Sequence, residues 1–223
     1  MSFIATYGSL LGMTGAIITF LFGVFKYVQL QKSKEVSSLL KISESIEKFV
    51  SKQNTKLVFT LTDYTSFHFD TFPYGDITLN DITVSDEMLG YALRPHSKGA
   101  NFTLFEAHLR EIFDAYFTEL EKYYYFIKIG AFDVDFLRPF IGYYVDIQGT
   151  MNPSKIRKNK IYLQCIHNYM ASYFPVNLVK LYQKFGHEIQ YRDLPYQKRE
   201  NYDRWMDNID SKIKEAKKQK QLS

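Results

Sequence analysis

Residues 3–25, FIATYGSLLGMTGAIITFLFGVF, carry no charged side chain, and no other stretch constrains the fold of this chain as strongly. A helix rises about 1.5 Å per residue, so a run of this length reaches about 34 Å, enough to cross a hydrocarbon core about 30 Å thick. We therefore expect one N-terminal transmembrane helix, with residues 1–30 acting as a membrane anchor.

The residues around this run favour a retained anchor over a secretory signal peptide. No basic residue precedes Lys26, whereas a signal peptide carries positive charge ahead of a shorter apolar core. Between Lys26 and Lys56 seven lysines outnumber three glutamates, and basic residues that flank a span stay on the cytoplasmic side. The expected topology therefore places the N-terminus outside and the following domain in the cytoplasm. The single cysteine, Cys165, fits this reducing compartment.

Small residues recur three or four positions apart along the predicted span, which places them on one stripe of the helix. They are Gly8, Gly12, Gly15, Ala16, Thr19 and Gly23. In lipid, close contact along such a stripe favours helix association, so the pattern predicts a homo-oligomer whose spans could line a pore. Glycine is common in membrane helices, and a single GxxxG also arises by chance. One span cannot form a pore alone.

The rest of the chain predicts a mainly α protein: a cytoplasmic helical bundle with a short loop or β insertion. Residues 31–54 repeat apolar residues at helical spacing and predict an amphipathic stalk or the first helix of the domain. Residues 55–100 predict loops and short strands, since Leu57, Phe59 and Leu61 alternate with polar neighbours. Residues 101–195 are expected to form the helical bundle, with short joins between antiparallel neighbours.

Capping residues place the helices of this bundle. Thr103 followed by Glu106 is a capping box ahead of a long amphipathic helix that ends near Gly130. A second helix is expected to open at Asp133 or Asp135 and to run to Gly149, with Pro139 inside or just before its main body. Proline and glycine at the joins then predict helices over 155–174 and 175–185.

Residues 196–223 predict a basic amphipathic C-terminal helix and tail. Its apolar face comprises Tyr202, Trp205, Met206, Ile209, Ile213 and Ala216. This face could pack on the domain, on another copy of the chain or on the inner membrane leaflet, where tryptophan and lysine are both favoured. We expect packing on the domain, because the domain needs cover for its apolar groups.

The charged and polar residues support no catalytic or metal site strongly. The chain carries a formal charge of +4, a mild bias towards an anionic membrane surface or a nucleic acid. The most basic stretch contains Lys155, Arg157, Lys158 and Lys160. It could hold RNA phosphates or lipid headgroups, and Arg157 with His167 is the candidate catalytic pair. Such a stretch is more often a solvated helix face, and a lone histidine is more often a hydrogen-bonded neighbour of the core.

Other polar residues are expected to be structural. His68, Asp70 and Asp63 match no spacing of metal ligands, so we expect no metal and no cofactor. Arg94 and His96 are expected in a solvent-facing loop. The acidic residues of the long helix are expected on its surface or as partners of neighbouring helices. They are Glu106, Glu111, Glu119 and Glu121.

Residues 113–145, FDAYFTELEKYYYFIKIGAFDVDFLRPFIGYYV, resemble the core helix pair of a poorly characterised bacterial family of membrane-anchored helical proteins. The layout is similar to that of the membrane accessory protein of type VI-B CRISPR systems. This resemblance implies a bacterial inner (plasma) membrane location, an oligomeric pore in antiviral defence and a divergent ribonuclease-like helical domain. It also implies RNA or a CRISPR effector protein as a partner. The ribonuclease pattern places its histidine closer to its arginine than here, where nine residues separate Arg157 from His167.

Three functions follow as hypotheses, and whether the chain is an enzyme stays open. The first is a single-pass protein that self-assembles through its span and forms a pore or perturbs the membrane, with lipid and other copies of itself as partners. The second is a membrane-tethered ribonuclease. The third is a monomeric membrane anchor for a protein-binding helical domain.

Overall fold

The computed structural model describes residues 25–26, 29–34, 36–98, 101–151, 160–194 and 202–222. The chain divides into two compact units, Met1–Ile46 and Glu47–Ser223. In the first unit the described residues are helical. The predicted span at 3–25, apart from Phe25, lies outside the described residues, and so does its small-residue stripe. Within the part of the chain that the structure describes, no helix is both long enough and apolar enough to cross a membrane.

The second unit opens with a helical end at residues 47–51, followed by helix α2 (Gln53–Asp63). The prediction of short strands at Leu57, Phe59 and Leu61 is wrong, because these residues lie within α2 and all three are buried. Val58 is buried as well, so apolar contacts surround much of this helix and the alternating pattern is not that of a half-buried strand. Packing against α4 and α5 decides the conformation of this segment.

Strands β1 (Ser66–Tyr74) and β2 (Ile77–Ser85) form an antiparallel hairpin, which confirms the presence of short strands predicted within residues 55–100. Gly75, with φ +58°, starts the connection between them, in a region that favours glycine. Asp70 and Asp81 are not paired between the two strands, and Asp81 takes φ +56°. This irregularity breaks the period of two, so the buried residues of β2 are spaced three and then two apart. They are Leu79, Ile82 and Val84.

Helix α3 (Asp86–Ala92) follows β2, and every one of its residues is buried. The side chain of Ser85 caps it by accepting a hydrogen bond from the amide of Met88 at 3.4 Å. A short 3-10 helix, η1 (His96–Lys98), follows. Residues 53–98 thus belong to the same compact unit as the later helices and supply part of its core.

Helix α4 (Leu104–Lys128) is the central element of the second unit and packs against α2, α3, α7 and α8. The predicted capping box is confirmed, because Thr103 and Glu106 exchange both of its hydrogen bonds. The helix ends as predicted near Gly130, which takes φ +72°. The amide of Gly130 donates to Ile127 and that of Ala131 donates to Phe126, so the end is a Schellman motif.

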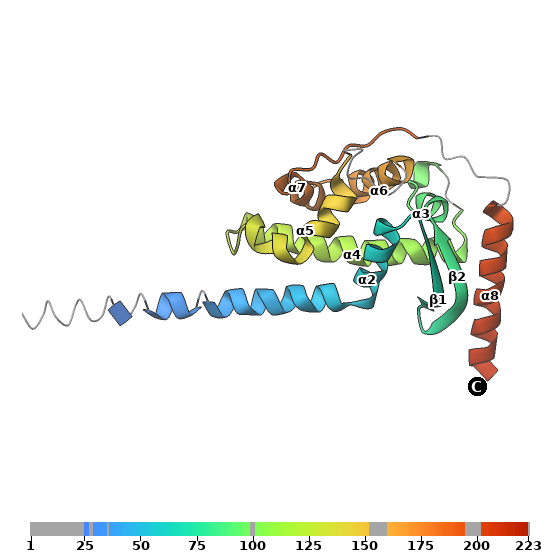
Figure 1. Cartoon of the computed structure of the whole chain (residues 1–223), viewed down its shortest axis with the longest axis horizontal. Coiled ribbons are helices and arrows are strands. Elements are labelled where there is room, and N and C mark those ends of the chain that lie inside the picture. Colours follow the sequence, from blue (N-terminus) through green and yellow to red (C-terminus); the bar gives the residue numbers. More distant parts are fainter. Residues whose placement is uncertain are drawn as a thin grey trace, which may run out of the picture. The chain divides into compact units, whose positions relative to one another are not determined.

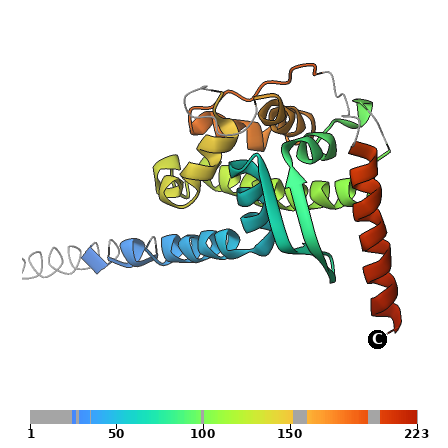
Figure 2. The same ribbon diagram turned by 45° about the vertical axis from the view of Figure 1, so that its right-hand side comes forward.

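Helix α5 (Val134–Gly149) starts at Asp133, whose carboxylate accepts a hydrogen bond from the amide of Phe136 at 3.0 Å. Of the two predicted caps, Asp133 is therefore the one used, and Pro139 lies inside the helix. Helices α6 (Lys160–Tyr173) and α7 (Asn177–Lys184) complete a mainly helical bundle, as predicted. Figures 1 and 2 show α5, α6 and α7 along one side of α4. The hairpin and α8 lie near the N-terminal end of α4.

Helix α8 (Tyr202–Leu222) runs along β2 and crosses the start of α4 (Figure 2). Four of its six predicted apolar-face residues are buried: Tyr202, Met206, Ile209 and Ile213. The carboxylate of Asp210 accepts hydrogen bonds from the amides of Leu104 and Phe105 at 3.2 Å each, and so caps α4 a second time. Packing on the domain, the expected alternative, is confirmed for this helix, while Trp205 remains 44% exposed.

Candidate functional site

Gln148 is the polar centre of the bundle and is fully buried. Its side-chain oxygen accepts hydrogen bonds from the hydroxyls of Tyr116 at 3.1 Å and Tyr182 at 2.5 Å. Its amide nitrogen donates to Thr62 at 3.2 Å. One side chain of α5 thus joins α2, α4 and α7. These contacts satisfy buried polar groups and align the helices, so we assign Gln148 a structural role.

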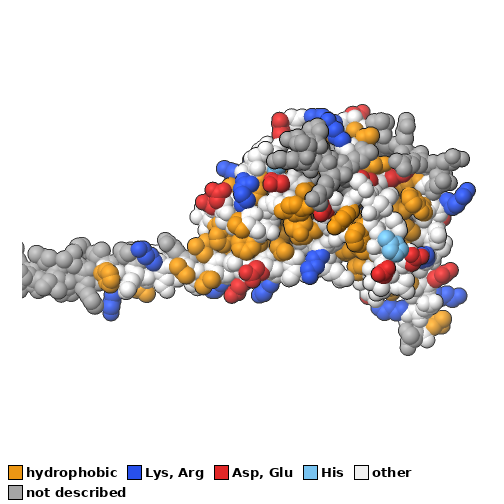
Figure 3. Space-filling view, viewed as in Figure 1, with side chains coloured by type: hydrophobic (Ala, Val, Ile, Leu, Met, Phe, Trp, Pro, Cys, Tyr) orange, Lys and Arg blue, Asp and Glu red, His pale blue; other side chains and the backbone are white. Residues whose placement is uncertain are grey.

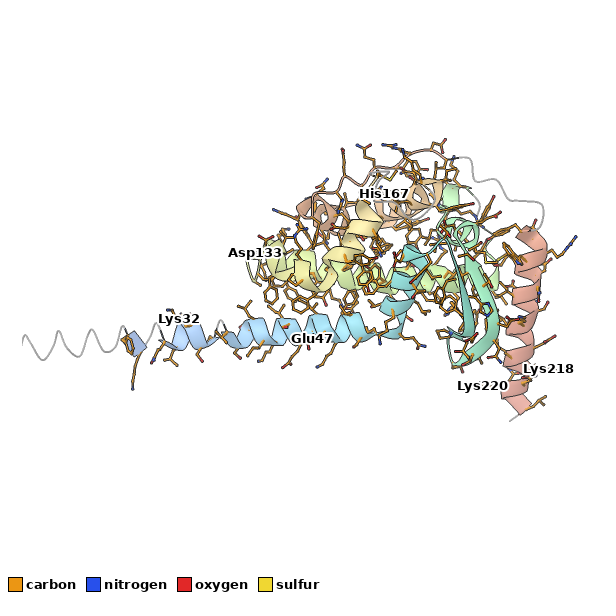
Figure 4. The ribbon with its side chains drawn as sticks, in the orientation of Figure 1. Lys32, Glu47, Asp133, His167, Lys218 and Lys220 are labelled. Carbon is orange, nitrogen blue, oxygen red and sulfur yellow. The ribbon has the colours of Figure 1, made fainter. Side chains whose placement is uncertain are left out.

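His167, one of the two catalytic candidates, lies inside this same region on α6 and is 1% exposed (Figure 4). Its Nε2–H donates to the carbonyl of Gln148 at 2.9 Å. Burial lowers the pKa of His167 to about 4, although the hydrogen bond to Gln148 acts in the opposite direction. A neutral, enclosed imidazole is not placed to exchange protons with a substrate. The geometry supports the structural interpretation of this histidine.

The lowered pKa of His167 predicts a loss of stability in mild acid. In the unfolded chain the histidine binds a proton as the pH falls through about 6.5, whereas the folded protein resists protonation down to about pH 4. The free energy of unfolding should therefore fall across this window, by about 3 kcal/mol in total. Urea denaturation of the wild type and of His167→Gln at pH 7.5 and 5 measures about 2 kcal/mol of this loss. The contribution of the other histidines is the same in both proteins and drops out of the comparison. A wild-type profile parallel to that of the variant would contradict the burial of a neutral ring.

The predicted basic patch is mostly outside the described residues. Lys155, Arg157 and Lys158 fall there, so the structure gives no geometry for the pair Arg157 and His167. Lys160 is described, begins α6 and is exposed, as a solvated helix face requires.

A second buried polar cluster joins α4 to α8 and to the segment after α3. Arg94 and Glu106 form an ion pair at 3.1 Å with side chains 6% and 2% exposed. Glu106 also accepts a hydrogen bond from the hydroxyl of Tyr202 at 2.5 Å. Burial and the negative charge of Glu106 raise the pKa of Tyr202, which keeps its proton. The prediction that Arg94 faces solvent is wrong, whereas His96 is exposed as predicted.

Arg110 extends this cluster, although the sequence analysis did not single it out. Its guanidinium donates to the carbonyls of Ala92 and Arg94 at 2.9 Å each. It also lies over the rings of Phe102 and Tyr169, at 4.5 and 4.8 Å from their centroids. Its single sequence signal is an arginine on the apolar face of an amphipathic helix, one residue after Leu109. Through these contacts the guanidinium joins α4 to the segment after α3 and to α6.

The hairpin histidine does not build a metal site. His68 lies 3.5 Å from Asp70 and 3.6 Å from Asp81, and all three side chains are at least half exposed. Asp63 instead accepts hydrogen bonds from the hydroxyl of Tyr143 at 3.2 and 3.3 Å. Among the described residues no group of three potential ligands could hold a metal ion.

A set of exposed and half-buried apolar side chains lies where α4 and α5 meet, and we call it the α4–α5 aromatic surface. It comprises Tyr125, Phe126, Ile129, Phe136 and Phe140. Tyr125 and Ile129 are 56% and 57% exposed, whereas the three phenylalanines are half-buried. The rings follow one another through Phe132 at centroid distances between 5.4 and 6.4 Å. Hydrophobic side chains gather on this part of the domain in Figure 3.

A pocket of about 280 Å³ lies between α2 and α5. It is lined by Lys56, Phe59, Thr60, Asp63, Tyr64 and Tyr144. The rings of Phe59 and Tyr144 stack face to face with centroids 3.3 Å apart. Tyr143 lies next to this pair, with its ring 5.1 Å from that of Tyr144. The α4–α5 aromatic surface and this pocket suit contact with an apolar or amphipathic partner more than acid–base chemistry.

Comparisons with protein-family models, with curated proteins and with solved structures found no match to this chain.

Proposed function

We propose that this chain is a single-pass membrane protein that assembles through its span and thereby perturbs or perforates the bilayer. The observation that carries the proposal is the uncharged run at residues 3–25 together with its small-residue stripe. Lipid acyl chains gain nothing from apolar helix surface, so a stripe that lets backbones approach closely is what favours association there. The excess of lysine after Lys26 supports a cytoplasmic position for the helical domain.

In this proposal the folded domain arranges and controls the assembly. Its polar clusters are buried and engaged in packing, as those of Gln148 and Glu106 illustrate. Membrane lipid and other copies of the chain are then its partners. A role in antiviral defence stays a prediction from the resemblance to the CRISPR-associated family.

A monomeric anchor for a protein-binding domain is the second candidate. The α4–α5 aromatic surface favours it, because its exposed and half-buried side chains are mostly aromatic, and aromatic residues are enriched in protein interfaces. The tethered ribonuclease has weaker support, since its candidate histidine is buried and neutral.

Replacing Gly12 and Ala16 together with leucine should abolish assembly, because two bulky side chains on the stripe hold neighbouring helices apart. The measurement is the mass of the full-length protein in detergent, by light scattering after size-exclusion chromatography. The matched control replaces Thr14 and Ile17 with leucine, which lie on the opposite face of a helix at 100° per residue. An oligomer that survives the first change removes the main support for the proposal. A wild-type monomer would select the second candidate.

A further inference from the structure

The α4–α5 aromatic surface combines the exposed Tyr125 and Ile129 and three half-buried phenylalanines with long basic side chains. Lys122 and Lys128 on α4 and Arg138 on α5 are exposed on the same helices, and the guanidinium of Arg138 lies 5.0 Å from the ring centroid of Phe185. Tyrosine places an apolar ring beside a polar hydroxyl, and lysine and arginine can lay their carbon chains along apolar groups while the charge stays in water. This combination suits the boundary between hydrocarbon and headgroups, where tyrosine and basic residues are enriched.

Acidic residues balance the charge of this end of the domain. Asp133 caps α5 through the amide of Phe136, and Asp135 lies 3.8 Å from Arg138. Figure 4 places Asp133 at the corner between α4 and α5, away from Lys220 on α8. Since the charges nearly cancel, apolar and aromatic contact rather than attraction to anionic lipid should dominate any interaction here.

Residues 26–46, which we call the tether, join the predicted span to the second unit. If residues 3–25 span the membrane, residues 26–46 are all that separates the bilayer from the second unit, about 32 Å as a helix. Attachment at that distance holds the domain at an effective concentration of the order of millimolar, so a weak surface contact is enough. Helix α4 alone is about 37 Å long, so one end of the domain can meet the headgroups while the other stays in water.

We propose that the α4–α5 aromatic surface rests in the headgroup region of the same bilayer that holds the N-terminal span. This inference rests on the proposed function, because the tether supplies the proximity. It adds a second membrane contact, which fixes how the domain is turned relative to the membrane. Assembled spans would then carry their domains in one orientation.

The single tryptophan of the chain makes the test specific. Trp205→Phe removes the only indole, and Tyr125→Trp then places a reporter on the proposed contact. Tyr191→Trp in the same background is the matched control, since Tyr191 is similarly exposed, at 46% against 56%. Each full-length variant is reconstituted into phosphatidylcholine vesicles with and without brominated acyl chains. Circular dichroism confirms that each variant is folded.

The expected result is that brominated vesicles quench the indole fluorescence of the Tyr125→Trp variant by about twofold, little changed by salt, with the control reporter unaffected. Two results would overturn the inference: neither reporter is quenched, or both are quenched equally. An alkaline carbonate wash separates these from failure of the proposed function. If the protein stays in the vesicles, the anchor stands and only the surface contact is lost. If the wash extracts the protein, the anchor fails and the inference fails with it.

Discussion

Replacing Glu106 with alanine is expected to lower the free energy of unfolding by about 4 kcal/mol, because the change leaves a buried charge without its partner. Arg94 would lose the carboxylate 3.1 Å away, in a site where both side chains are almost fully buried. The hydroxyl of Tyr202 and the amide of Thr103 would lose the same acceptor. Urea denaturation followed by far-ultraviolet circular dichroism measures the loss.

Glu119→Ala on the same helix is the matched control. Glu119 pairs with Lys52 and Lys122 at 3.0 Å each, but all three side chains are in contact with solvent. Such pairs contribute about 1 kcal/mol or less, so the two glutamate changes should differ several-fold. Equal costs for the two variants would show that the Arg94–Glu106 pair is not desolvated as the structure describes.

Gln148→Leu should lower the free energy of unfolding by a similar amount, about 4 kcal/mol. Leucine keeps most of the volume but removes the acceptor of two tyrosine hydroxyls and the donor to Thr62. An unsatisfied buried polar group costs about 1–3 kcal/mol, and several are created at once. The measurement is again the urea midpoint, at pH 7.5, where His167 is neutral in the folded and unfolded states.

Gln183→Leu provides the comparison for this second change. Gln183 is exposed on α7, so its replacement should alter stability by less than about 0.5 kcal/mol. The double variant Gln148→Leu with Tyr182→Phe then tests whether the loss comes from the tyrosine hydroxyl that Gln148→Leu leaves without an acceptor. The double variant should lose less stability than the sum of the two single variants, because it no longer contains that hydroxyl. If the two single losses simply add, the cause is packing and not lost hydrogen bonds.

Local signals predicted the parts of the fold that depend on neighbouring residues. The capping box of Thr103 and Glu106, the helix end at Gly130 and the start of α5 at Asp133 use contacts between residues at most five positions apart. The strand prediction at Leu57 failed because its burial depends on α4 and α5, which come much later in the chain. The prediction that Arg94 faces solvent failed for the same reason, because its partner Glu106 belongs to another element.

The candidate sites divide in the same way. A basic stretch and a lone histidine are visible along the chain, but the burial of His167 is set by the bundle around it. The α4–α5 aromatic surface lies within residues 113–145, which carried the family resemblance. The sequence did not predict which of its side chains are exposed. An amphipathic pattern shows which residues share a face, and the neighbours that cover that face decide which of them remain exposed.

By itself the sequence determined the uncharged run at residues 3–25, the capping signals and the helical character of most of the chain, because these depend on composition and short spacings. The tertiary structure alone decided that Gln148 and Glu106 are buried centres, that His167 is neutral and that Tyr125 and Ile129 are exposed where α4 and α5 meet. Burial, pKa and ion pairing arise from groups brought together across long separations in the chain, and no local pattern records which groups will meet.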